Sequence, residues 1–311
     1  MDSLLTEPFQ SAYMQRALAE AVLLGIFGGV LGVYVVLRHL AFISDALTHT
    51  VFPGIAVAFL LDASLYLGAF VAGALSAVLL TVLTRNRRVH DDAALAVLLT
   101  AFFSVGVVVV SRSESFSADL TALLFGRILS VSTTDIVQTA LTMVVVLAVL
   151  AVLHKELVLR AFAPESARAM GYRLDVLDLV LNLLITLFVV AAVKAVGTVL
   201  VVALVVTPAA AAQLWCRSIR SMMVVAAVIG VVAGWLGLVV SYRASIDHDV
   251  RLASGATIVL VITVVFALAF AARKVRDVVV GRRWTAAEPD HPDGSAGLAT
   301  PDATALLAGE P

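Results

Sequence analysis

The sequence predicts an all-α polytopic membrane protein, a bundle of eight or nine transmembrane helices. Hydrophobic residues make up 61% of the 311 residues and charged residues only 14%. Soluble domains are about half apolar and about a quarter charged, so this composition falls outside their range. The mean hydropathy is +1.05. Nine apolar stretches also reach, or nearly reach, the length of about 20 residues that a spanning helix needs.

The nine stretches follow one another along the chain with short connections. They cover residues 17–37, 41–61, 64–84, 92–111, 133–153, 175–193, 196–213, 219–241 and 253–272. The second contains polar residues and the seventh is short, which is why the number of spans is eight or nine. We expect an N-terminal segment over 1–16 and the transmembrane domain over 17–284. Residues 285–311 have too little bulky apolar content to fold, and we expect a disordered cytoplasmic tail.

The basic residues are distributed unevenly between the two sides of such a bundle. One set of loops holds 15 of the 21 Lys and Arg residues, and the opposite side holds 6. The richer loops lie around Arg38 and within 85–88, 155–173, 217–220 and 273–283. Because basic loops stay in the cytoplasm, we expect this side and the C terminus to face inward.

The second stretch carries a carboxylate and an imidazole. Asp45 and His49 are four residues apart, so a helix places both on one face, one turn apart. Ionisable residues inside a span are costly unless they are paired, hydrated or bound to an ion. Both groups could ligate one divalent cation. A hydrogen-bonded Asp–His pair that pins two helices, or Asp45 as an interfacial helix cap, fits the same pattern.

Pro53 follows in the same stretch. Proline has no backbone N–H, so the carbonyl of His49, four residues back, loses its helical partner. A carbonyl freed at membrane depth is tolerated only in the protein interior or beside a hydrated cavity. We therefore expect Asp45, His49 and this carbonyl to line one pathway. One Asp and one His are too few for tight coordination, and a twofold dimer with this helix on its axis would double the set.

The first stretch is marked by glycine rather than by ionisable residues. Its glycines share one helix face, because they recur at spacings of three and four: Gly25, Gly28, Gly29 and Gly32. Small residues let a neighbouring backbone approach closely. We expect a tightly packed neighbouring helix here, with a structural and not a chemical role.

The loop before the last stretch is acidic and contains a histidine. Asp247, His248 and Asp249 stand together in it. On the outer side of the membrane, such a loop would concentrate divalent cations at the mouth of a pathway. A plain solvated loop explains the same residues, because charged loop residues are common.

A short helix is predicted in the basic loop between the fifth and sixth stretches. Pro164 suits the first helical position, and the segment Glu165-Ser166-Ala167-Arg168-Ala169-Met170-Gly171 ends on a glycine that suits the position just past a helix. This helix would either lie on the membrane surface or dock a soluble partner.

Several kinds of chemistry are excluded by missing residues. The chain has no Gly-x-x-x-x-Gly-Lys-Ser/Thr loop for nucleotide phosphates, no His-Glu-x-x-His pair and no Gly-x-Ser-x-Gly elbow. Its single cysteine, Cys216, rules out a disulfide framework or a Cys-based metal site within the chain. The formal net charge of −1 argues against nucleic-acid binding. We therefore expect a transport subunit rather than an enzyme, with any ATP hydrolysis in another subunit.

Three motifs resemble those of one transporter family. The run Leu37–Gly54, which contains Asp45 and His49, resembles the second-helix signature of the transmembrane subunit of bacterial ATP-binding-cassette importers for zinc, manganese or iron. Residues 196–209 and 254–257 are similar to two further patterns of that family. The resemblance extends from about Ala17 to Arg273.

The resemblance implies a homodimeric permease of the bacterial cytoplasmic membrane. Its partners would be a cytoplasmic ATP-binding subunit and an extracellular metal-binding protein. It would hold no permanent cofactor, because the divalent metal is the cargo. Asp45 and His49 would be pathway ligands, and the Glu165–Tyr172 segment would be the coupling helix to the ATPase. Lys194 is a cation that the family pattern does not predict.

Two other functions compete with metal import. A permease for an iron chelate or cobalamin would have a wide, mostly apolar pathway and would not need Asp45 and His49 on one face. A secondary cation transporter would use the two groups as a proton relay. Inverted repeats would support that function, and we find no convincing internal repeat.

Overall fold

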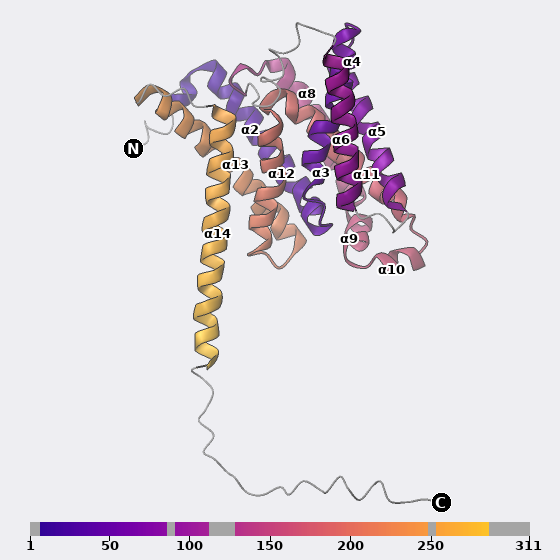
Figure 1. Ribbon diagram of the computed structural model, residues 1–311. Helices are drawn as coiled ribbons and strands as arrows, with labels where there is room; N and C mark the ends of the chain where they lie inside the picture. Colours follow the sequence, from indigo (N-terminus) through magenta and orange to yellow (C-terminus); the bar gives the residue numbers. More distant parts are fainter. Residues whose placement is uncertain (1–6, 86–90, 112–127, 248–252, 286–311) are drawn as a thin grey trace, which may run out of the picture. The chain divides into compact units, whose positions relative to one another are not determined.

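The computed structural model describes residues 7–85, 91–111, 128–247 and 253–285, and within these ranges it contains helices and turns but no strand (Figure 1). In chain order the elements are η1 (Glu7–Gln10), α2 (Ala12–Leu37), α3 (Ile43–Thr50), α4 (Phe52–Leu60), α5 (Leu65–Arg85), α6 (Asp91–Val110), η2 (Ile128–Ser130), α8 (Thr133–Val152), α9 (His154–Phe162), α10 (Pro164–Ala169), α11 (Leu174–Val196), α12 (Thr198–Gln213), α13 (Ile219–Asp247) and α14 (Ser254–Thr285).

The predicted all-α membrane bundle is confirmed. In the described part of the chain, 8 helical segments are long and apolar enough to cross a membrane, with α3 and α4 together forming one of them. Helix α12, with 16 residues, is shorter. The first helix begins at Ala12 rather than at residue 17, because Met14 in its first turn is buried against the core and extends the apolar face.

Helices α2 and α11 form the interior of the bundle. About two thirds of the apolar window of each is buried (67%), against 22% for α6, α8 and α14. Helix α2 packs along α12 and α13, and α11 packs against α5 and α8. The outer helices therefore present apolar side chains away from the protein, where lipid would solvate them.

The predicted glycine face of α2 contacts two helices rather than one. Gly25 and Gly29 meet the backbone of α13, whereas Gly28 and Gly32 meet the backbone of α12. A Cβ atom on Gly32 would overlap the carbonyl oxygen of Val205. Residues four apart on a helix point in nearly the same direction, whereas residues three apart point in somewhat different directions. Gly25 and Gly29 therefore face one neighbour, and Gly28 and Gly32 face another. Helix α2 is thereby fixed between α12 and α13.

The chain divides by internal packing after Ala271. The described part of the second unit is the end of α14, where Arg273 Nε lies 3.2 Å from Asp277 Oδ2. Residues 286–311, most of the predicted tail, lie outside the described ranges. The domain limits drawn from composition therefore stay predictions.

Replacing Gly32 by Ala should destabilise the bundle. The added methyl group must push α2 and α12 apart, and overpacking of this kind costs about 1–3 kcal/mol, more than the gain in helix propensity, about 1 kcal/mol. The measurement is the midpoint of thermal unfolding in detergent. Gly234→Ala is the matched control, because its nearest neighbour would be the Ala21 methyl at 3.2 Å. An unchanged midpoint for Gly32→Ala would contradict the packing described above.

Candidate metal site and its surroundings

Asp45 and His49 lie on the same side of α3, as their spacing predicts. Nε2 of His49 is 3.8 Å from Oδ1 of Asp45. This distance is too long for a hydrogen bond, so the two groups do not satisfy each other. In the single chain the His49 side chain is 30% exposed and the Asp45 side chain 42% exposed. Both groups are therefore open to a third partner.

The two other interpretations of this pair fit the geometry less well. A direct Asp–His hydrogen bond is not formed at 3.8 Å. Asp45 does lie in the first turn of α3, where a carboxylate interacts favourably with the helix dipole. The N-cap residue of α3 is Phe42, however, and no side-chain cap hydrogen bond is present there.

The imidazole of His49 is held beside an aromatic ring of α6, which in turn packs near a ring of α4. The ring of Phe103 meets it edge-on, with centroids 5.9 Å apart and an interplanar angle of 89°. Phe52 lies 5.7 Å from Phe103 on the same side. Thr48 of α3 donates its hydroxyl to its own helix backbone, at Asp45 O, over 2.6 Å. The aromatic wall therefore orients the imidazole, and the neighbouring hydroxyl does not compete for it.

The second span is divided at Val51. Helix α3 ends at Thr50 and α4 begins at Phe52, with Pro53 in the first turn of α4. Proline is tolerated at such a position because its missing N–H would have no helical partner there. The interruption thus lies between His49 and Pro53. The prediction that the carbonyl of His49 is free is wrong, because a backbone N–H at the end of α3 donates to it.

One chain supplies an incomplete ligand set. Within the described ranges no group of three or more His, Cys, Asp or Glu residues is arranged to hold a metal ion. The predicted outer mouth cannot be added to this set: Asp247 is the last residue of α13, and His248 and Asp249 lie outside the described residues. The mouth stays a prediction.

The short helix predicted after residue 163 is present as α10. It begins at Pro164, and Gly171, with a φ of +88°, follows its end. Ala167 is buried, whereas the rest of the segment faces outward: Glu165, Ser166, Arg168, Ala169 and Met170. Glu165 and Arg168 pair at 3.3 Å. Whether this helix docks an ATPase subunit stays a prediction at this point.

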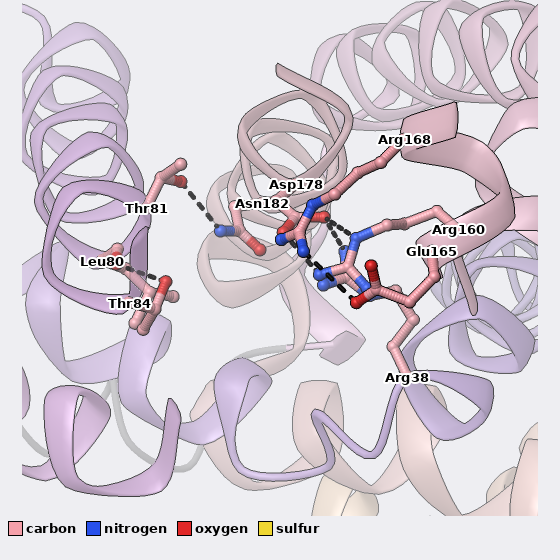
Figure 2. Close-up of polar contacts among 9 residues, drawn as sticks. All are labelled: Arg38, Leu80, Thr81, Thr84, Arg160, Glu165, Arg168, Asp178 and Asn182. Carbon is pink, nitrogen blue, oxygen red and sulfur yellow. Dashed lines mark hydrogen bonds and ion pairs between the residues drawn. The ribbon is translucent and has the colours of Figure 1, made fainter. Parts of the chain in front are cut away.

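A partly buried charge cluster lies beside α10 (Figure 2). Asp178 of α11 is bound by Arg38, at 2.7 Å, and by Arg160 of α9, at 3.1 and 2.9 Å. Burial lowers the pKa of the Arg38 guanidinium, and the Asp178 carboxylate opposes that shift. Asp178 and Arg160 were not among the candidate residues predicted from the sequence. The available signal was an acid inside the predicted sixth span, which is a functional candidate by default.

Further polar groups extend this cluster along α11. Asn182 donates to the Thr81 hydroxyl of α5 over 3.2 Å, and Asp175 pairs with Arg85 at 3.2 Å. A polar pocket of about 140 Å³ lies between α5, α9, α10 and α11. Basic residues from three loops predicted to share one face of the membrane therefore meet at one end of α11.

Lys194 lies near the other end of α11. Its Nζ is 2.7 Å from Oδ1 of Asp135, which also forms a capping box with Ser132 at the start of α8. The lysine that the family pattern does not predict thus has a carboxylate partner on another span. It lies 16 residues beyond Asp178, which corresponds to about 24 Å along the helix.

Glu20 of α2 is a further buried acid, 0% exposed, that was not singled out from the sequence.

Comparison with known proteins gives consistent matches over nearly the whole membrane part. The model of the ABC 3 transport family matches residues 10–273. The manganese transport system membrane protein MntC of Halalkalibacterium halodurans is 38% identical over 259 residues, covering 83% of this chain and 87% of that protein. The chelated iron transport system membrane protein YfeD of Yersinia pestis is 35% identical, covering 89% and 91%.

A solved structure has a similar fold. PsaBC from Streptococcus pneumoniae, determined in complex with Fab, superposes with a TM-score of 0.74 at 32% sequence identity. The match covers 86% of this chain and 95% of that chain.

Proposed function

The chain belongs to the ABC 3 transport family, and we propose that it is the permease subunit of an ATP-driven importer that carries manganese into the bacterial cell. The pair of Asp45 and His49 on α3 carries this proposal. Their partly exposed side chains lie in a membrane span without a hydrogen bond to each other, and an ionisable group there is costly unless it is paired, hydrated or bound to an ion. A bound divalent cation would remove that cost.

The separation of the two groups suits a shared ion. Transition-metal ligands lie about 2.1 Å from the metal, so two ligands of one ion are at most about 4.2 Å apart. The observed 3.8 Å between His49 Nε2 and Asp45 Oδ1 falls within that limit. Two donors hold an ion weakly, and transport requires an ion that can leave again. A second copy of the chain would bring the set to four donors.

Manganese is the proposed cargo because the relatives favour it and the donors are compatible with it. Carboxylate oxygen and imidazole nitrogen accept manganese, iron and zinc alike. Among the relatives, MntC is named for manganese transport and YfeD for chelated iron transport. Iron is therefore the second candidate, and zinc has less support. A wide apolar pathway for a whole chelate would leave Asp45 and His49 without a role.

The remaining partners follow from the same family membership. A soluble ATP-binding subunit would dock on α10, and an extracellular metal-binding protein would deliver the ion on the opposite side. ATP binding and hydrolysis would then alternate the access of α3 between the two faces. The loops around Arg38, Arg85 and α10 would lie in the cytoplasm, in agreement with their basic residues.

Removing the two proposed metal donors should weaken metal binding. We expect Asp45→Asn combined with His49→Gln to weaken Mn²⁺ binding to the purified permease at least about tenfold, because the neutral amides are poor ligands. Isothermal titration with Mn²⁺, Fe²⁺ and Zn²⁺ makes the measurement. Asp62→Asn, which removes an exposed acid from a loop, is the matched control. Manganese binding and uptake at wild-type levels in the double variant would overturn the proposed site.

Charging the exposed end of α10 should release the ATPase subunit. Met170 is 69% exposed, and two further exposed aromatic side chains lie near it in the sequence, Phe162 (65% exposed) and Tyr172 (41% exposed). We expect Met170→Asp to weaken binding of the ATPase subunit at least about tenfold, measured by co-purification from membranes, and to leave Mn²⁺ binding unchanged. Met170→Leu keeps the apolar contact and serves as the control. Equal recovery of the ATPase with both variants would contradict docking at α10.

A further inference from the structure

We propose that Arg38, Asp178 and Arg160 form a coupling joint that carries movement of the ATPase-docking segment to the metal-binding helix. In this joint Asp178 is the positioning residue. The proposal rests on the function proposed above, because it takes α10 as the docking helix and α3 as the metal helix. It adds the physical connection between them.

A single carboxylate links three elements in this joint (Figure 2). Arg38, directly after α2, places its Nη1 2.7 Å from Asp178 Oδ1. Arg160 of α9 donates from Nε to Oδ1 at 3.1 Å and from Nη2 to Oδ2 at 2.9 Å. A two-point contact of this kind fixes the orientation of the guanidinium as well as its distance. The end of α2, the last turn of α9 and the first turns of α11 are therefore held in one arrangement.

Burial makes these ion pairs different from the others nearby. The side chains of Arg38, Asp178 and Arg160 are 8%, 19% and 23% exposed. Arg85 and Asp175, one turn earlier on α11, form a pair in which the side chains are 75% and 53% exposed. Solvent screens the exposed pair, whereas loss of one partner in the buried cluster leaves a charge without compensation.

The joint is connected to the metal helix by a short, tied turn. Leu40 N–H donates to Val35 O at 2.9 Å, and Ile43 N–H donates to Leu40 O at 3.0 Å. Leu40 and Ile43 are 4% and 0% exposed. Because the turn is hydrogen-bonded and is anchored in the core by Leu40 and Ile43, a displacement of Arg38 would pass to the start of α3. Asp45 follows two residues after Ile43.

The other side of the joint leads directly to the docking helix. Only Ala163 separates α9, which carries Arg160, from α10. A second contact joins α9 to α2, since the Tyr34 hydroxyl lies 2.8 Å from Nδ1 of His154. Movement of α10 would therefore shift α9, the end of α2 and the start of α3 as one body.

The test uses the permease assembled with its ATPase subunit in proteoliposomes. We expect Asp178→Asn to keep ATP hydrolysis within about twofold of wild type and to lower Mn²⁺ transported per ATP hydrolysed at least about tenfold. Binding of Mn²⁺ to the permease should stay unchanged. Asp175→Asn is the matched control, because it removes an acid from the same helix but from the exposed pair. Wild-type transport per ATP in Asp178→Asn would overturn the joint.

A second variant covers the case in which Asp178→Asn fails to fold, because two buried arginines then lack a carboxylate. Arg38→Met together with Asp178→Asn removes one positive charge with the negative one and leaves Arg160 without a like charge beside it. We expect this double variant to assemble with the ATPase subunit and to stay uncoupled. Wild-type transport per ATP in the double variant would show that the cluster has only a structural role and would overturn the proposal.

A measurement that needs no metal tests the joint separately from the proposed manganese cargo. Spin labels on Phe42→Cys and Lys155→Cys, both exposed, in a Cys216→Ser background report the distance between the start of α3 and α9. We expect one narrow distance with and without ATP in the wild-type joint, and a broadened distribution in Asp178→Asn. An unbroadened distance distribution in Asp178→Asn would overturn the joint. If a chain with an intact joint fails to transport Mn²⁺, only the proposed cargo is overturned.

Discussion

The cost of an ionisable group in a membrane determines how this protein is built. A charged residue within or beside a span is stabilised by a partner, and several in the described part of the chain have one, although both carboxylate oxygens of Glu20 on α2 are buried without a hydrogen bond. Asp178 binds two arginines, and Asp135 binds Lys194. Against this background, Asp45 and His49 stand out, because 3.8 Å separates them and both are partly exposed. The absence of a hydrogen bond between them, more than their presence, is what supports the proposal that they bind an ion.

The two ends of α11 illustrate how polar groups are placed in an apolar bundle. Asp178 and Lys194 lie about 24 Å apart on one helix, and each is neutralised by residues from other elements. Between them α11 is mostly apolar and buried. Helix α2 runs beside it and is fixed by glycine contacts to α12 and α13. The fold thus combines a rigid apolar middle with ionic connections at its ends.

Local features of this molecule were predictable from the sequence, and long-range pairings were not. Apolar runs indicated the spans, and the spacing of Asp45 and His49 indicated their common face, because both depend only on helix geometry. Pro53 indicated the interruption near Val51 for the same reason. The partners of Lys194 and Arg38 lie 59 and 140 positions away in the sequence, on other helices. Nothing in a local pattern specifies such a pairing. The sequence predicted that the glycines of α2 share one face, but it did not predict that this face would contact two helices.

The proposed donor pair would have a genetic consequence. In a twofold assembly with one ion between the subunits, neither subunit would supply the complete ligand set, since each would contribute only an aspartate and a histidine. A cell that makes intact and donor-less chains together would form mixed pairs with half of the donors. A damaged allele would then be dominant over the intact one, in contrast to an importer in which each polypeptide encloses its own ion.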